Sequence, residues 1–203
     1  MRPDLWALER ELRARGARHV AGVDEAGRGP LAGPVVAAAV ILPPRFTHDG
    51  INDSKLLGAR RREELFGVIT GAAVAWAVAE ATEAEIDAIN ILQATLRAME
   101  RALDALAVAP DYLLVDGNRL PRVLIPGEAV VGGDGRAACI AAASILAKVH
   151  RDRLMAAHHE RWPAYGFDAH KGYGTPAHLR ALARHGPCPI HRRTFKGVIG
   201  CRP

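Results

Sequence analysis

Residues 21–30, AGVDEAGRGP, decide the fold of this chain. An apolar run ends there in two adjacent carboxylates and a glycine-rich turn, and residues 31–42 resume as a nearly unbroken run of Val, Ala and Ile. Apolar runs bounded by turn residues are typical of buried strands, so together they predict a β-hairpin. In a regular strand Asp24 and Glu25 point to opposite faces, so both reach one centre only where the strand ends or kinks, which glycines permit. A charged turn on the rim of a sheet is the alternative interpretation.

Helices and strands are expected on either side of this hairpin. Amphipathic spacing or capping residues predict helices over residues 4–15, 59–69, 82–103 and 140–155, and a last one capped by Thr175. Alternating or compact apolar runs predict further strands over residues 72–80, 112–115 and 129–131. Three strands in sequence followed by alternating helix and strand predict an α/β fold with a mixed sheet flanked by helices.

Composition places the chain among globular proteins. With 203 residues, 49% of them hydrophobic and 24% charged, it fits one soluble domain with at most a small appended piece. The first residues lack the apolar region of a signal peptide, and no span approaches the ~18 apolar residues of a membrane helix. We therefore expect a cytoplasmic protein without a membrane partner. The three cysteines lack Cys-x-x-Cys spacing, which argues against a disulfide framework or a thiolate zinc site.

Charge is distributed unevenly along the chain. Residues 169–203 contain no Asp or Glu and carry +7, which leaves −2 for the first 168 residues of a chain whose net charge is +5. A basic tail on a slightly acidic body suggests a polyanionic partner, nucleic acid first, although basic termini are also often solvated. We expect a catalytic core over residues 1–155 and a basic helical extension over residues 156–203 packed on it. Six of the nine histidines lie from His158 onward without zinc-like spacing, so they are expected to be solvated or to face phosphate.

Four carboxylates are candidates for chemistry: Asp24, Glu25, Asp116 and Asp134, each at a strand end in a glycine-rich turn. If their strands lie side by side, the cluster repels itself unless a divalent cation sits within it. Oxygen ligands without Cys or a His-Glu-x-x-His pattern point to Mg²⁺ or Mn²⁺ rather than zinc. Such a site suits phosphoryl chemistry with two metal ions.

Basic and small groups beside these carboxylates complete a candidate phosphodiester site. Arg28, the backbone N–H groups of Gly27 and Gly29, Lys55 and Lys148 are suited to holding phosphate oxygens. The Gly-x-Gly pair lacks the rest of a dinucleotide fingerprint, and the chain has no Walker loop. A nucleotide site of either kind is therefore not expected.

Ser54 and Ser144 have no histidine base placed beside them by sequence. Hydrogen bonding to a phosphate or a helix cap is expected of them rather than nucleophilic attack.

Several motifs in order resemble those of bacterial ribonuclease HII. The resemblance runs from about residue 20 to residue 195 and rests on VDEAGRG (23–29), NDSK (52–55), VDGN (115–118), GD (133–134), AAASILAKV (141–149), RD (151–152), HKGY (170–173) and HR (191–192). It implies a ribonuclease H-like fold and an endonuclease that cuts RNA in RNA–DNA hybrids and on the 5′ side of single ribonucleotides in duplex DNA. Mn²⁺ or Mg²⁺ would be required.

The same resemblance assigns roles to individual residues. Asp24, Glu25, Asp116 and Asp134 match the acidic metal-binding set, and Gly27, Arg28 and Gly29 match the loop that reads the ribose 2′-hydroxyl and the junction phosphate. Tyr173 matches the tyrosine that packs on the next deoxyribose. The chain has Gly132 where many relatives have lysine, which weakens any phosphate contact there but leaves Asp134 in register. The 2′-hydroxyl alone separates the two sugars, and glycine amides can approach it closely.

Two alternatives remain beside this interpretation. The related ribonuclease HIII has an additional N-terminal domain, for which the 19 residues before Val20 leave no room. A non-catalytic nucleic-acid binder with the same fold would have lost its chemistry, whereas the four acidic positions are intact. We expect a monomer acting on RNA–DNA hybrid and on ribonucleotide-containing duplex DNA.

Overall fold

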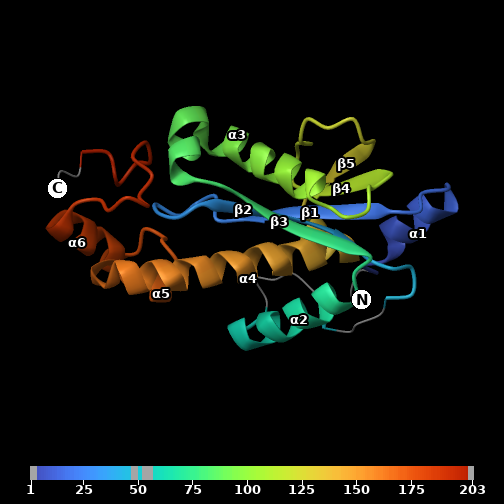
Figure 1. The fold of residues 1–203 in the computed structure, drawn as a ribbon, viewed down its shortest axis with the longest axis horizontal. Helices are drawn as coiled ribbons and strands as arrows, with labels where there is room; N and C mark the ends of the chain where they lie inside the picture. The colour runs from blue at the N-terminus through green and yellow to red at the C-terminus, as the bar shows by residue number, and fades with distance from the viewer. Residues whose placement is uncertain (1–3, 47–49, 52–56, 201–203) are drawn as a thin grey trace.

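The computed structural model describes residues 4–46, 50–51 and 57–200. Its centre is a five-stranded sheet in the order β3-β2-β1-β4-β5 (Figure 1). The strands are β1 Val20–Ala26, β2 Val35–Ile41, β3 Ala75–Ala81, β4 Tyr112–Asp116 and β5 Gly127–Val130. β1, β2 and β3 pair antiparallel, whereas β4 runs parallel to both β1 and β5. The predicted mixed sheet and its opening hairpin are confirmed.

Helices cover both faces of this sheet. α3, Glu83–Asp104, lies on one face, and α4, Ala138–Arg161, lies on the other beneath β1 and β2 (Figure 1). Because both faces are covered, all seven residues of β2 are buried, which explains why its sequence is apolar throughout rather than alternating. α4 approaches β1 so closely that a side chain at Gly22 would overlap the backbone of Cys139.

The remaining helices lie around these layers. They are α1 Ala7–Ala14, α2 Ala59–Ala72, α5 Phe167–His170 and α6 Pro176–His185, with short 3₁₀ turns η2 Gly133–Gly135 and η3 Pro163–Tyr165. α1 fixes the start of α4, because Glu9 Oε1 accepts a hydrogen bond from Cys139 N at 2.8 Å. Thr175 caps α6 as expected, with His178 N 3.3 Å from its Oγ1.

The long helix α3 differs from the continuous helix that its apolar stripe predicts. Its capping box is present: Thr82 N donates to Glu85 Oε2 and Glu85 N donates to Thr82 Oγ1. At Asn90, however, the backbone is not helical, with φ of 69° and ψ of 163°, and the helix is kinked. Asn90 Oδ1 accepts from the N–H groups of Leu92 and Gln93, so this side chain caps a second helical segment. A positive φ is uncommon outside glycine, and asparagine is among the residues that adopt it most often.

The C-terminal extension packs on the core through a separate hydrophobic cluster. Tyr165, Phe167 and Leu182 of the extension meet Leu31 and Ala32 of the core there. α4 runs without a break through residues 155 and 156, so one helix joins the core to the extension. Cys139 and Cys188 are buried and free, and Cys201 lies outside the described residues.

The expectation that the late histidines are solvated is wrong for two of them. His178 and His191 are fully buried, with their Nε2 atoms 3.0 Å apart, and the His170 ring stacks on His178 at 4.5 Å. His191 Nδ1 also accepts a hydrogen bond from Cys188 N at 2.9 Å. Charged imidazoles at His178 and His191 would repel one another at this distance, and burial lowers the pKa of both, so this pair favours neutral rings.

Acid is therefore expected to destabilise the extension through these rings. Burial, and then the neighbouring His178, lower the pKa of His191 from 6.5 to about 4. A histidine whose pKa is lowered by folding contributes stability above pH 6.5 that is lost as the pH falls toward 4. Linkage gives a loss of roughly 2 kcal/mol at pH 5 from His191 alone.

Urea denaturation at pH 7.5 and pH 5 measures this loss. His191→Asn is expected to shrink the difference between the two pH values, whatever its effect at either one. His185→Asn, at an exposed position of α6, is the control and is expected to keep the full difference. An undiminished difference in His191→Asn contradicts the assignment.

Candidate active site

Asp24 is the buried centre of the acidic cluster. Its carboxylate is 4% exposed and accepts hydrogen bonds from the Ser144 hydroxyl of α4 and from Glu25 N, the latter at 2.7 Å. Burial raises the pKa of Asp24 well above its usual value, and the charges of Glu25 and Asp116 raise it further. The site is therefore crowded with negative charge that a cation would relieve.

Strand register brings Asp116 beside Asp24. Val23 of β1 pairs with Val115 of the parallel strand β4, so the next residue on each strand is an aspartate. Gly133 N donates to Asp116 Oδ1 at 2.7 Å, which ties the turn η2 to the end of β4. η2 also carries Asp134, which is 5% exposed. The ends of β1 and β4 and the turn η2, which were predicted to meet, therefore lie together at one end of the strands.

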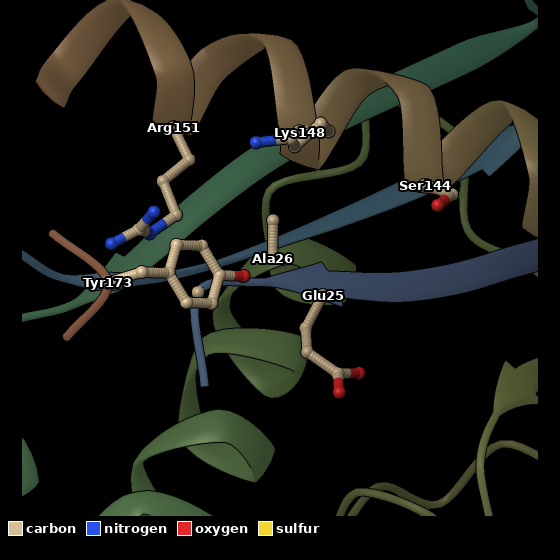
Figure 2. Close-up of a pocket in the computed structure, with 7 residues that line it drawn as sticks. Glu25, Ala26, Ser144, Lys148, Arg151 and Tyr173 are labelled. Atoms are coloured by element: carbon tan, nitrogen blue, oxygen red, sulfur yellow. The ribbon is translucent and has the colours of Figure 1, made fainter. Parts of the chain in front are cut away.

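Of the two expected ways for the acidic pair to reach one centre, a strand end or a kink, the structure has no kink, and β1 ends one residue after Glu25. β1 stays paired with β2 through Ala26, and its backbone turns only at Gly27, where φ is 99°. Asp24 consequently faces α4, whereas Glu25 points away from that helix (Figure 2). Within the described ranges no three His, Cys, Asp or Glu side chains stand together in an arrangement that would hold a metal ion. The donor chemistry nevertheless fits a hard divalent cation, because the carboxylates around Asp24 supply oxygen ligands and unbalanced charge.

A pocket of about 120 Å³ lies between the end of β1 and α4 (Figure 2). Residues from both ends of the chain line it: Glu25, Ala26, Gly27, Ser144, Lys148, Arg151 and Tyr173. Three of the sequence-predicted substrate residues, Gly27, Lys148 and Tyr173, are thus brought together. Tyr173 is 48% exposed, and its ring would meet a methyl group added at Gly29 at 3.6 Å.

The predicted cations differ in their availability. Lys148 Nζ forms an ion pair with Asp152 at 2.5 Å, and burial lowers its pKa. Arg28 is half-exposed and lies 3.4 Å from Glu25 Oε1, so it links the glycine loop to the acidic pair. Lys55 lies outside the described residues, as does Ser54.

Two buried arginines to which the sequence motifs assigned no role support the loop of residues 27–34. Arg151 of α4 donates to the carbonyls of Pro34, Ala32 and Lys171 at 3.0–3.1 Å. Arg192 donates to the carbonyls of Gly33, Arg28 and Gly27 at 2.6–2.9 Å. Both arginines belong to motifs of the family resemblance, RD (151–152) and HR (191–192), but the sequence did not indicate that either is buried. Arg192 therefore supports the loop from its buried side. Not every basic residue of the C-terminal tail is available to bind phosphate.

Solved structures share this fold. The ribonuclease H2 of Pyrococcus horikoshii OT3 superposes with a TM-score of 0.75 at 28% identity, covering 89% of this chain and 95% of that one. The mixed sheet with helices on both faces is therefore a ribonuclease H2-type fold.

Sequence comparison identifies the family. The profile described as Ribonuclease HII matches residues 21–198. Ribonuclease HII 1 of Methylibium petroleiphilum is 62% identical over 178 residues, which are 88% of this chain and 90% of that protein. Ribonuclease HII of Idiomarina loihiensis is 58% identical over 179 residues, which are 88% of this chain and 96% of that one. The chain belongs to the ribonuclease HII family.

Membership defines the general chemistry. The protein is a nuclease, a hydrolase of phosphodiester bonds, from a divalent-metal-dependent family with ribonuclease H activity on RNA–DNA hybrids. In the part of the chain that the structure describes, no helix is long and apolar enough to span a membrane.

Proposed function

We propose that this protein hydrolyses the RNA strand of RNA–DNA hybrids and also cuts on the 5′ side of single ribonucleotides embedded in duplex DNA. The products would carry a 3′-hydroxyl and a 5′-phosphate, with water as the nucleophile and no covalent enzyme intermediate. The observation that carries the proposal is the junction at residues 24–29, where the buried Asp24 and the partly buried Glu25 pass directly into a glycine loop that borders a pocket. Metal binding and ribose reading would then occupy one continuous turn.

Asp24, Glu25, Asp116 and Asp134 would hold the divalent ions, Mn²⁺ or Mg²⁺. When bound, two such ions would activate a water molecule and stabilise the leaving oxygen. Ser144 holds the Asp24 carboxylate in place through its hydroxyl hydrogen bond. Its role is thus to position a ligand rather than to act as a nucleophile.

The substrate contacts would lie on the pocket side of the loop. The N–H groups and side chain of Gly27, Arg28 and Gly29 would bind the ribose 2′-hydroxyl and the adjoining phosphate, and the Tyr173 ring would pack on the following deoxyribose. Lys148 would contribute to phosphate binding from α4, as would Lys55 from the preceding loop. We further propose that the protein acts as a cytoplasmic monomer.

Removal of the Arg28 side chain tests whether ribose reading by the glycine loop is coupled to metal binding by the acidic pair. Arg28→Ala is expected to lower kcat/KM about 10–100-fold on a duplex with one ribonucleotide, because a charge-assisted contact to the junction is lost. Selectivity for that duplex over all-DNA duplex should fall with it. Rates are measured by gel cleavage assays with divalent ions.

The matched control is Arg60→Ala, which removes the same charge from a side chain that is 95% exposed on α2. It should cut at the wild-type rate. If Arg28→Ala also cut at that rate with unchanged selectivity, the loop would not read the junction.

A further inference from the structure

We infer that Arg192 is a positioning residue that aims the backbone N–H groups of Arg28 and Gly29 at the ribonucleotide. The inference rests on the proposed function, in which this loop reads the 2′-hydroxyl. It assigns to the C-terminal extension a part in substrate selectivity that is distinct from phosphate binding.

The guanidinium of Arg192 donates hydrogen bonds to three main-chain carbonyls. It is 0% exposed, and Nε donates to Gly33 O at 2.9 Å, Nη1 to Arg28 O at 2.9 Å and Nη2 to Gly27 O at 2.6 Å. Its Cζ lies over the Phe195 ring, 4.9 Å from the centroid. A planar group held by three carbonyls and a ring has a single orientation, so it fixes the orientation of the peptides that it binds.

Because the peptide unit is planar, hydrogen bonds that hold its carbonyl on one side also fix the direction of its N–H group. In a trans peptide the carbonyl of one residue and the N–H of the next point in opposite directions. No cis peptide occurs in the described residues. Because Arg192 holds the carbonyls of Gly27 and Arg28 on the inner side, the N–H groups of Arg28 and Gly29 must point to the outer side. Neither N–H has a hydrogen-bond acceptor among the described residues, so both are available to a ligand.

The charge of Arg192 adds to this orientation. Burial, and then Arg151, lower the pKa of Arg192 to about 9, so the guanidinium remains charged at neutral pH. Glu83 and Asp87 balance that charge through space. A cation bonded to the carbonyl end of a peptide polarises it and strengthens the N–H at its other end as a donor. Burying a charge is costly, and a purely structural clamp would not require one.

Arg151 has the complementary task of holding the base of the loop. It contacts the carbonyls of Ala32 and Pro34 rather than those of the two reading peptides. Backbone hydrogen bonds from the same C-terminal segment complete the frame: Gly33 N donates to Ile190 O at 2.9 Å, and Arg192 N donates to Leu31 O at 2.9 Å. The base of the loop is therefore held in place, and of the two arginines only Arg192 hydrogen-bonds to the peptides that would face the sugar, whereas Arg151 packs against Gly27 without such a bond.

Binding measurements in a non-cleaving background test the inference without relying on catalysis. Asp24→Asn serves as the parent protein, and its affinities for a duplex with one ribonucleotide and for the same duplex in all-DNA form are measured by fluorescence anisotropy in Mg²⁺. Adding Arg192→Gln is expected to lower the preference for the ribonucleotide duplex about tenfold while leaving the affinity for all-DNA duplex unchanged. Arg192→Lys keeps the charge but replaces the planar group of three nitrogens with a single nitrogen, which cannot reproduce the three carbonyl contacts in their present directions, so it should lose preference as well.

Leu103→Ala, a core change in α3, is the control for lost stability and should keep the parent's preference. Thermal melting shows that each variant is folded, and Arg192→Lys supplies the answer if the glutamine variant does not fold. Equal preference in the parent and in the folded Arg192 variants overturns this inference alone, as does an equal loss of affinity for both duplexes. A parent without preference for the ribonucleotide overturns the proposed ribose reading and this inference with it.

Discussion

Asp24→Asn is expected to abolish cleavage while making the metal-free protein more stable. Asparagine keeps the size of the side chain and its hydrogen-bonding oxygen but removes a buried charge that lies beside Glu25 and Asp116. Loss of the proposed metal ligand at the reacting centre should lower kcat by about 10³-fold or more. The same change relieves the repulsion that raises the pKa of Asp24 in the absence of metal.

The sign of the stability change depends on pH. A carboxyl group whose pKa is raised by folding favours the folded state most when it is protonated, and it destabilises that state as the pH rises through the folded pKa. The advantage of Asp24→Asn in melting temperature should therefore be small near pH 4 and larger at pH 8 in EDTA. Divalent ions should stabilise the wild type more than the variant, because ligands that bind only the folded state add to its stability.

Asp104→Asn, at the exposed end of α3, is the matched control and should change neither cleavage nor melting temperature. If the Asp24→Asn variant were less stable than the wild type without metal, or if it still cut, the proposed role of the Asp24 carboxylate in the acidic cluster would be wrong.

Gly27→Ala is the second change with a large expected effect. Its φ of 99° is unfavourable for a side chain, and a methyl group there would overlap Nε and Cδ of Arg151. Either the loop or the buried arginine must move, so we expect the protein to lose about 2–5 kcal/mol of stability. Displacement of the loop should also lower kcat/KM on every ribonucleotide-containing substrate.

Gly29→Ala, two residues further on, is the internal comparison. Its backbone is not in the left-handed region, and its methyl group would make only ordinary contact with Tyr173 at 3.6 Å. Urea denaturation should therefore find this variant as stable as the wild type, while its activity reports how closely the sugar approaches residue 29. Similar stability of the two alanine variants would contradict the packing of Arg151 beneath Gly27.

Sequence patterns among residues that are close together in the chain predicted much of the fold. The hairpin, the capping box at Thr82 and the cap at Thr175 depend on residues close in sequence, and the structure contains all three. The acidic set followed from the same logic, because strand ends in glycine turns are visible in sequence. Their assignment as metal ligands stays a prediction, and so do the roles of Lys148 and Tyr173.

Contacts between distant residues could not be predicted. The second strand begins at Val35 rather than at residue 31, because the carbonyls of Ala32, Gly33 and Pro34 are taken by Arg151 and Arg192 instead of by a neighbouring strand. The burial of His178 and His191 likewise depends on rings contributed by separate segments of the extension. A basic, histidine-containing tail is similar in composition whether it is solvated or packed, so only tertiary structure separates the two.

The hydrogen bonds from Arg192 to the loop of residues 27–34 also bear on the order in which the protein folds. Arg192 reaches carbonyls that are 164 and 165 positions earlier in the chain, whereas the hairpin forms between neighbours. Contacts across such a separation carry a large loop-closure cost and form late. A chain emerging from the ribosome thus has its hairpin and its carboxylates well before it has the residue that aligns the loop. Selectivity for ribose would be among the last properties that the folding protein acquires.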